Sequence, residues 1–205
     1  MIRSEYFEKN VSRETIMKLS KFHNILIDNN KKMSLISKNS EKIAVERHYV
    51  DCAQMIKYFD KSDKLILDIG SGAGLPGIIL DIIKSDYNLN FSTHLIDKSP
   101  KKAKFLHNVN SLLNLDIKIH NCDLRQISDR SFTTLVSRAF KPMKEFFEII
   151  LDTDIKFKKI ILMKGEKFMN ELKIAKKYFE INCESFKSLT NPKSKLFVIK
   201  SVSKI

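Results

Sequence analysis

The sequence predicts an α/β fold: a seven-stranded, mostly parallel sheet covered by helices on both faces, with a C-terminal antiparallel hairpin and an N-terminal helical extension. Short apolar runs alternate with helical patterns from residue 64 onward, which is typical of parallel sheets. Four of the five glycines lie within residues 70–77, where a strand passes into a helix. Two further apolar runs follow residue 179 and flank the turn-forming segment 190–194, which indicates the hairpin.

The first 60 residues carry helical patterns. Ser12 is suited to cap a helix with one apolar face, and Ser40 is suited to cap a second helix after a break at 31–37. Strands are expected at 65–69, 92–96, 117–121, 133–137 and 159–163, and in the hairpin at 181–188 and 195–201. Helices are expected at 76–84, 100–114 (capped by Ser99), 142–151 and 167–178, with at most a short helical turn in 121–132.

The chain is expected to form a single domain, residues 1–205, because its length suits one core and no Pro/Gly-rich linker divides it. Residues 1–60 would form the extension and 61–205 the cofactor-binding core. The formal net charge of +13 would suit a polyanionic partner such as nucleic acid. Only six of the 37 basic residues are Arg, however, and Asn and Ile are abundant, so a compositional bias explains the charge equally well.

The cysteines and the N-terminus bear on where the protein works. Cys52, Cys122 and Cys183 are far apart and form no CxxC pair, so reduced thiols are expected instead of disulfides or a zinc site. The first ten residues lack the apolar segment of a signal peptide, and the most apolar stretch, 65–83, is interrupted by Asp, Pro and Gly. We expect a cytoplasmic protein without a metal site or a membrane span, and we expect a monomer.

The glycine-rich segment predicts a site for a nucleotide cofactor, because a strand, a glycine loop and a helix N-terminus together form a phosphate or nucleotide cradle. Residues 72–77 satisfy GxGxxG, and Asp97 follows 20 residues after Gly77, as in dinucleotide-binding proteins. Read from the strand end, the same segment is Asp68-x-Gly70-x-Gly72-x-Gly74. In this form it resembles the loop of class I methyltransferases, which bind S-adenosylmethionine.

Two features favour the methyl donor: Asp68 ends its strand, and the chain closes with a hairpin, as in the seven-stranded Rossmann-like methyltransferase sheet. A dinucleotide enzyme would also need a second half-domain, for which little chain remains. S-adenosylmethionine is the expected cofactor and S-adenosylhomocysteine the product. Two alternatives stay open: Asp97 could cap the helix near Ser99, and Asp68 could be satisfied within its loop. The residues expected to bind the cofactor are Asp68, Gly70, Gly72, Gly74, Leu75, Gly77 and Asp97.

Further segments resemble one family, the bacterial small-subunit ribosomal RNA guanine-N7 methyltransferases, also called the glucose-inhibited division protein B family. Ser34 stands where the family usually has Asn, and residues 122–126 lack its Arg-Val/Ala-Glu-Glu pattern. The Gly-Leu-Pro-Gly and Ser-Arg-Ala pieces are more specific than the generic loop. The matching segments run in family order over residues 32–200: Lys32 to Ile36, Arg47-His48 with Asp51, Asp68 to Ile78, Leu95-Ile96-Asp97, Lys101 to Leu106, Val136 to Phe140, Leu162 to Gly165 and Phe197 to Lys200.

The resemblance implies methylation of one guanine at N7 in 16S rRNA, with the small ribosomal subunit or a late precursor as the partner. It places Asp123 and Leu124 beside the adenine of the cofactor. Guanine N7 carries a lone pair and no proton, so the reaction needs alignment of the reactants and no general base. The fourth strand ends in residues 137–140, Ser-Arg-Ala-Phe, and lacks the Asp/Asn-Pro-Pro-Tyr motif of amino-group methyltransferases. This argues against an exocyclic amine as the target.

Four basic side chains are expected to position the substrate. Arg138 would bind the methionine carboxylate or an RNA phosphate, and Lys164 a phosphate or guanine O6. Arg47 and His48 match the family and would act in RNA binding or pocket closure. The structural alternatives are exposed basic residues for Arg138 and Lys164, and helix packing against an acidic partner for Arg47 and His48.

Three other functions stay open: a small-molecule methyltransferase of the same fold, a nicotinamide oxidoreductase and a non-catalytic RNA-binding assembly factor. A base-modifying enzyme often stacks its flipped base on an aromatic ring, for which Phe105 and Phe140 are available. Phe105 fits helical core spacing better, whereas the role of Phe140 stays open.

Overall fold

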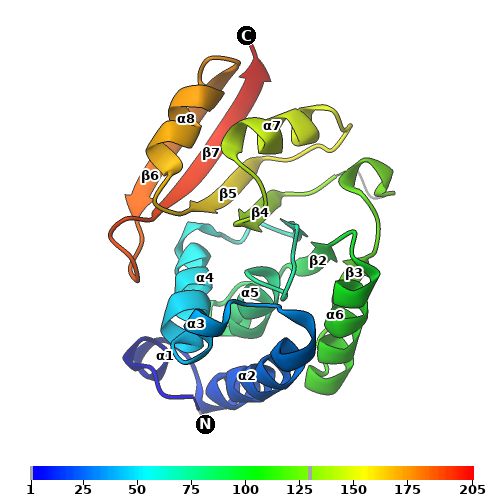
Figure 1. Cartoon of the computed structure of the whole chain (residues 1–205), viewed down its shortest axis with the longest axis vertical. Helices are drawn as coiled ribbons and strands as arrows, with labels where there is room; N and C mark the ends of the chain where they lie inside the picture. The colour runs from blue at the N-terminus through cyan, green and yellow to red at the C-terminus, as the bar shows by residue number, and fades with distance from the viewer. Residues whose placement is uncertain (1, 129–130) are drawn as a thin grey trace.

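The structure of the chain, a computed structural model, describes residues 2–128 and 131–205. Within these residues, seven strands form one sheet in the order β3-β2-β1-β4-β5-β7-β6 (Figure 1). β7 is antiparallel to β5 and β6, and the other neighbours are parallel. The predicted α/β fold with its C-terminal hairpin is therefore confirmed. The strands are β1 (Leu65–Ile69), β2 (Ser92–Ile96), β3 (Ile117–His120), β4 (Thr134–Arg138), β5 (Lys159–Lys164), β6 (Phe179–Lys187) and β7 (Lys195–Lys204).

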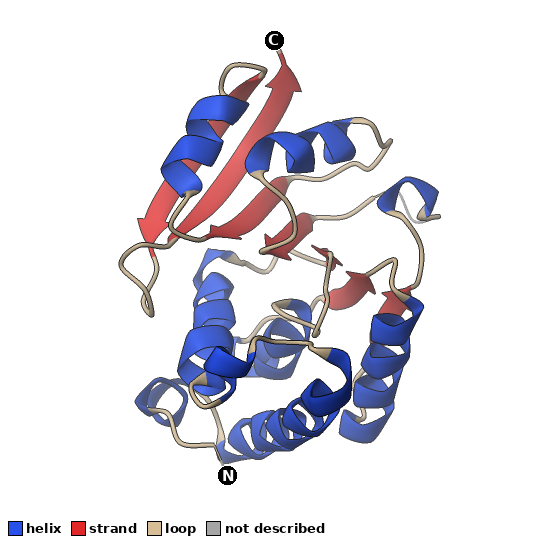
Figure 2. Cartoon of the chain, in the orientation of Figure 1, coloured by secondary structure: helices blue, strands red, loops and turns tan. Residues whose placement is uncertain are grey.

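Helices cover both faces of the sheet (Figure 2). On one face, Ile66 of β1 packs in the same buried cluster as Phe22 of α2. On the other face, Leu67 packs in a second cluster with Phe147 of α7. β1 is thus buried on both sides, which is why its sequence is a continuous apolar run. The helices are α1 (Glu5–Asn10), α2 (Arg13–Met33), α3 (Lys38–Glu41), η1 (Val45–Val50), α4 (Asp51–Ala53), η2 (Gln54–Tyr58), α5 (Gly77–Ile83), η3 (Lys84–Tyr87), α6 (Pro100–Leu113), η4 (Leu124–Gln126), α7 (Met143–Leu151) and α8 (Phe168–Ala175).

The N-terminal helices follow the prediction only in part. Ser12 caps α2, since its hydroxyl accepts a hydrogen bond from the Thr15 amide at 3.2 Å. Ser40 caps nothing: it lies inside α3, and its hydroxyl donates to the Ser37 carbonyl instead. The expected second helix is a succession of α3, the π-helical η1, α4 and the 3₁₀-helical η2. None of the helices in residues 2–128 and 131–205 is both long and apolar enough to cross a membrane.

The hairpin is longer than predicted. β6 begins at Phe179, which pairs with Lys204 of β7 and has a buried side chain. The ladder between the two strands shifts register between Asn182 and Cys183. The connection after β3 holds only the short turn η4, as expected, although its residues 129–130 lie outside the described residues. Because β1, β2, β4 and β5 are parallel, their carboxyl ends meet at one edge of the sheet, and this edge carries the candidate site.

Candidate functional site

The glycine loop connects β1 to α5 and is tied to the neighbouring strand. The amides of Gly70 and Ser71 both donate to the Ile96 carbonyl, at 3.0 and 3.1 Å. Gly70, Gly72 and Gly74 all have positive φ, of 72°, 55° and 82°. These values explain the glycine concentration in the sequence, because side chains disfavour this backbone region.

Asp68 closes the loop from within the core. Its Oδ2 accepts a hydrogen bond from the Gly77 amide at 2.8 Å, while its buried Oδ1 has no partner among the described residues. Burial raises the pKa of Asp68 to about 7. Asp68 is therefore fully buried and stabilises the first turn of α5 through Oδ2. Its Oδ1 is left without a hydrogen bond to the described residues.

Asp97 joins the loop to the start of α6. Its Oδ2 accepts a hydrogen bond from the Gly72 amide at 3.0 Å, and its Oδ1 accepts one from the Ser99 amide at 2.8 Å. The cap of α6 is Ser99, as predicted, since its hydroxyl accepts from the Lys102 amide. Asp97 thus fixes the backbone of the glycine loop at Gly72 and that of the residue before α6, Ser99.

A cavity of about 240 Å³, the first cavity, opens at this edge. Four of the predicted cofactor-binding residues line it: Gly70, Asp97, Asp123 and Leu124. The other predicted ones, Asp68, Gly72, Gly74, Leu75, Gly77 and Arg138, do not line it. The remaining lining residues, which the sequence motifs did not assign to the cofactor, are Ile69, Ile96, Lys98, Lys102, Cys122, Ala139, Phe140 and Ile149.

The segment that departs from the family pattern still forms an ordered wall of the first cavity. Asp123 caps η4 and accepts a hydrogen bond from the Arg125 amide at 3.1 Å, while the Gln126 side chain accepts from the Asp123 amide at 3.2 Å. This reciprocal capping fixes the backbone at Leu124. Residues 122–126 therefore form a capped turn although they lack the family pattern.

Phe140 lies directly over the glycine loop. A Cβ atom built on Gly70 would overlap the Phe140 ring, with ring Cγ only 2.7 Å away. Ala139, just before it, has a φ of 54°, so the chain turns sharply after β4. This turn brings the aromatic ring against the loop backbone.

Gly70→Ala is expected to lower the free energy of unfolding by about 2 kcal/mol or more, because it combines a left-handed backbone with the Phe140 overlap. Gly165→Ala is the matched control, since a Cβ there meets no atom within 4 Å, and its effect should stay within about 0.5 kcal/mol. Urea unfolding of both variants measures the difference. Equal stabilities would contradict the close packing of Phe140 on the loop.

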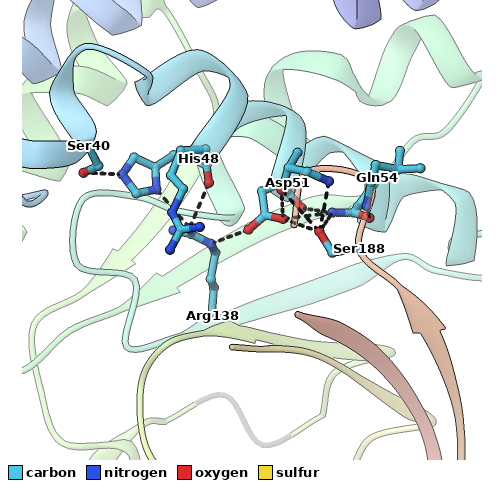
Figure 3. Close-up of polar contacts among 9 residues, drawn as sticks. Ser40, His48, Asp51, Gln54, Arg138 and Ser188 are labelled. Carbon is cyan, nitrogen blue, oxygen red and sulfur yellow. Dashed lines mark hydrogen bonds and ion pairs between the residues drawn. The ribbon is translucent and has the colours of Figure 1, made fainter. Parts of the chain in front are cut away.

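Arg138, at the end of β4, is held by the N-terminal helices (Figure 3). Its Nε donates to Asp51 Oδ2 at 3.3 Å, and its Nη2 donates to the Arg47 carbonyl at 3.1 Å and to His48 Nδ1 at 2.9 Å. Nη1 makes no hydrogen bond within the described part of the chain. Arg138 is therefore neither exposed nor in the first cavity, and His48 and Asp51 pack against it.

Asp51 links this arginine to the turn between β6 and β7 (Figure 3). Its Oδ1 accepts hydrogen bonds from Ser188 at 2.9 Å, Thr190 at 2.7 Å and Gln54 at 3.0 Å. Three distant parts of the chain thus converge on one buried carboxylate. In the sequence, Asp51 belongs to a motif shared with the family, but no local pattern indicates its role.

His48 is buried as a neutral ring. Because Arg138 donates to Nδ1, the proton must sit on Nε2, which donates to the Ser40 hydroxyl at 2.9 Å. Burial and the charges of Arg138 and Arg47 lower the pKa of His48 to about 4.

This histidine is expected to make stability depend on pH. The unfolded ring takes up a proton near pH 6.5 and the folded ring near pH 4, so the contribution is complete above about pH 6.5 and is lost as the pH falls towards 4, up to about 3 kcal/mol. Unfolding free energies of the wild type and His48→Gln at pH 7 and pH 5 test this, with exposed His107→Gln as control. His48→Gln should weaken the pH dependence. An unchanged slope would contradict the neutral buried ring.

Lys164 ends β5 and is buried, not exposed. Its ammonium group pairs with Glu171 Oε2 at 3.0 Å and also donates to the Lys141 carbonyl. Burial lowers the pKa of Lys164, and the bond to Glu171 opposes this effect. A second cavity of about 520 Å³ lies here and shares Ala139 and Phe140 with the first one; its other lining residues are Lys141, Pro142, Met163, Lys164, Gly165, Glu166, Lys167 and Glu171.

Solved structures share this architecture at low sequence identity. The PH0226 protein from Pyrococcus horikoshii OT3 matches with a TM-score of 0.58 and 15% identity, over 83% of this chain and 95% of that chain. A SAM dependent methyltransferase from Aquifex aeolicus matches with a TM-score of 0.58 and 12% identity, over 83% and 98%. The strand order, the antiparallel β7 and the glycine loop define the fold as that of the Rossmann-like methyltransferases, which in general use S-adenosylmethionine.

Sequence comparison narrows this class. The GidB family model, described as rRNA small subunit methyltransferase G, matches residues 15–197. The ribosomal RNA small subunit methyltransferase G of Pelagibacter ubique is 34% identical over 199 residues, or 96% of this chain and 93% of that protein. The one of Rickettsia bellii (strain OSU 85-389) is 33% identical over 195 residues, or 95% and 98%. The chain belongs to the rRNA small subunit methyltransferase G family, a family of enzymes, as the sequence motifs predicted.

Proposed function

We propose that this chain transfers a methyl group from S-adenosylmethionine to N7 of a guanine in 16S rRNA, with the small ribosomal subunit or a late precursor as substrate. The proposal rests on family membership and on the cavity beside the glycine loop. It also rests on the carboxyl end of β4, where the sequence lacks the motif of amino-group methyltransferases. It implies work in the cytoplasm, where ribosomal subunits form. We also propose that the protein acts as a monomer.

The residues around the first cavity fit the donor. At Gly72 a Cβ would meet only the Gly70 carbonyl oxygen, at 3.8 Å, so a ligand can approach the loop backbone closely there. Asp97 would accept hydrogen bonds from the ribose hydroxyls, and Leu124 and Ile96 would pack on the adenine. When bound, S-adenosylmethionine supplies a methyl group on a positively charged sulfur that a nucleophile can displace. Asp68, whose buried Oδ1 lacks a partner, lies under the same loop and would act through it or on the amino group of the donor.

No general base is needed in this proposal, because guanine N7 presents a lone pair and no proton. The chain has to orient the base, exclude water and tolerate the positive charge that methylation places on the ring. We assign Lys164 to guanine O6 or a phosphate, and Arg138 to the methionine carboxylate or an RNA phosphate through Nη1. Arg47 and His48 would serve by holding Arg138.

Exposed lysines around the first cavity suit an RNA partner. Lys98 lies at its rim, and Lys101 and Lys104 follow on the exposed side of α6. Such side chains can contact phosphates without reading sequence.

The experiment is transfer of labelled methyl from S-adenosylmethionine to five acceptors: unmodified small subunits, late precursors, free 16S rRNA, large subunits and a mixture of small metabolites. We expect label in small subunits or their precursors and none in large subunits. Label in small metabolites but in no RNA would support the small-molecule alternative instead. Binding to subunits without any label would support the non-catalytic assembly factor.

A further inference from the structure

We propose that the second cavity receives the target guanine, that Phe140 provides its stacking face, and that Glu171 selects guanine over adenine. This inference rests on the proposed function and deepens it. It starts from the wall that the two cavities share. Phe140 and Ala139 line both, so the space beside Asp97 and the space beside Lys164 adjoin at this aromatic side chain.

The second cavity has the chemistry of a purine site. Phe140 is half-buried and its ring is fixed against Gly70, so an aromatic surface stands ready without reorganisation. Pro142 and Met163 add apolar lining, and Gly165 leaves open space, since a Cβ there would meet nothing within 4 Å. Stacking of a base on such a ring is favourable for every base and gives affinity without selectivity.

Glu171 supplies the selectivity. Its Oε2 accepts hydrogen bonds from the Met143 amide at 3.1 Å and from Lys164 at 3.0 Å, which fix the carboxylate. Glu171 lines the second cavity, and its Oε1 makes no hydrogen bond to the described residues and is left as a free acceptor. Guanine offers donors at N1–H and at its 2-amino group, whereas adenine offers a lone pair at N1. A fixed carboxylate therefore attracts guanine at this edge and repels adenine.

The same carboxylate suits the reaction. Methyl transfer to N7 leaves a positive charge on the purine ring and makes N1–H a stronger donor. A hydrogen bond from N1–H to Glu171 thus strengthens as the new N–CH₃ bond forms and the S–CH₃ bond breaks. Lys164 pairs with the other oxygen at 3.0 Å and so holds the carboxylate in place.

Binding of guanosine and adenosine 5′-monophosphates to the full chain, saturated with S-adenosylhomocysteine, tests this by NMR titration. The wild type should prefer the guanine nucleotide, and Glu171→Gln should reduce that preference at least about 10-fold, because one charge-assisted hydrogen bond is lost. Phe140→Leu should weaken both nucleotides by about 10-fold, and Phe140→Tyr should restore them. Glu184→Gln is the matched control and should change neither, because Glu184 is an exposed, lysine-paired carboxylate on β6 that lines neither cavity.

Three results would overturn the inference: no binding of the guanine nucleotide to the wild type, an unchanged preference in Glu171→Gln, or equal losses of nucleotide and S-adenosylhomocysteine in Phe140→Leu. The affinity for S-adenosylhomocysteine and the melting temperature of every variant identify any folding defect. Methyl transfer by the same preparations separates the two proposals. If the wild type methylates small subunits normally and one of these three results is found, only the guanine site is refuted. If the wild type does not methylate small subunits, the proposed function is refuted.

Discussion

Asp97→Ala is expected to weaken binding of S-adenosylmethionine by roughly 100-fold, which corresponds to the loss of one or two hydrogen bonds to a charged acceptor. Asp97 lines the first cavity and also holds the Gly72 and Ser99 amides. The substitution thus removes a ligand contact and loosens the loop around it. Isothermal titration with S-adenosylmethionine and S-adenosylhomocysteine measures both affinities.

Two variants separate the causes. Asp97→Asn keeps one oxygen acceptor and loses the charge, so its loss should be smaller than that of alanine. Asp154→Ala removes an exposed carboxylate that makes no hydrogen bond or ion pair with the described residues and lines neither cavity, so its affinity should equal that of the wild type. Unchanged affinity in Asp97→Ala would refute the assignment of the first cavity to the donor.

Asp51→Ala is expected to reduce the free energy of unfolding by about 3 kcal/mol, because it leaves the Arg138 guanidinium, whose side chain is only 17% exposed, without its counter-charge. It also removes the acceptor of Ser188 and Thr190, which tie the β6–β7 turn to the helices. Urea unfolding monitored by circular dichroism measures the change.

The double variant Asp51→Ala/Arg138→Met is the informative comparison. If the unpaired guanidinium causes most of the loss, the double variant should be more stable than the sum of the single effects implies. Strictly additive effects would show that Asp51 and Arg138 stabilise the fold independently, contrary to the contacts around Asp51.

Much of the fold could be predicted because buried parallel strands and glycine loops carry local signals. β1 reads as an apolar run since both of its faces are covered, and the positive φ values of the loop require glycine. The hairpin extends further than predicted because its outer strand is partly exposed and lacks a continuous apolar pattern. Ser40 misled the prediction since its hydroxyl serves Ser37 and His48 instead of a helix start.

The site was harder to predict, because its contacts join residues far apart in the chain. Asp97 and Gly70 follow a spacing rule, and both line the first cavity. Asp51 and Arg138 are 87 residues apart, and no local pattern links them. Glu171 lies in an ordinary amphipathic helix, so only the folded arrangement brings it to Lys164. In the sequence, the only sign that Lys164 needs an acidic partner such as Glu171 is its position at the end of the apolar run that forms β5.

The central claim is tested most directly by mass spectrometry of nucleosides from 16S rRNA, after reaction of unmodified small subunits with this chain and S-adenosylmethionine. The account predicts 7-methylguanosine, about one per subunit, with the wild type and Asp154→Ala and little or none with Asp97→Ala. A methylated adenosine, a guanosine methylated at another atom, or no methylated nucleoside at all would contradict it.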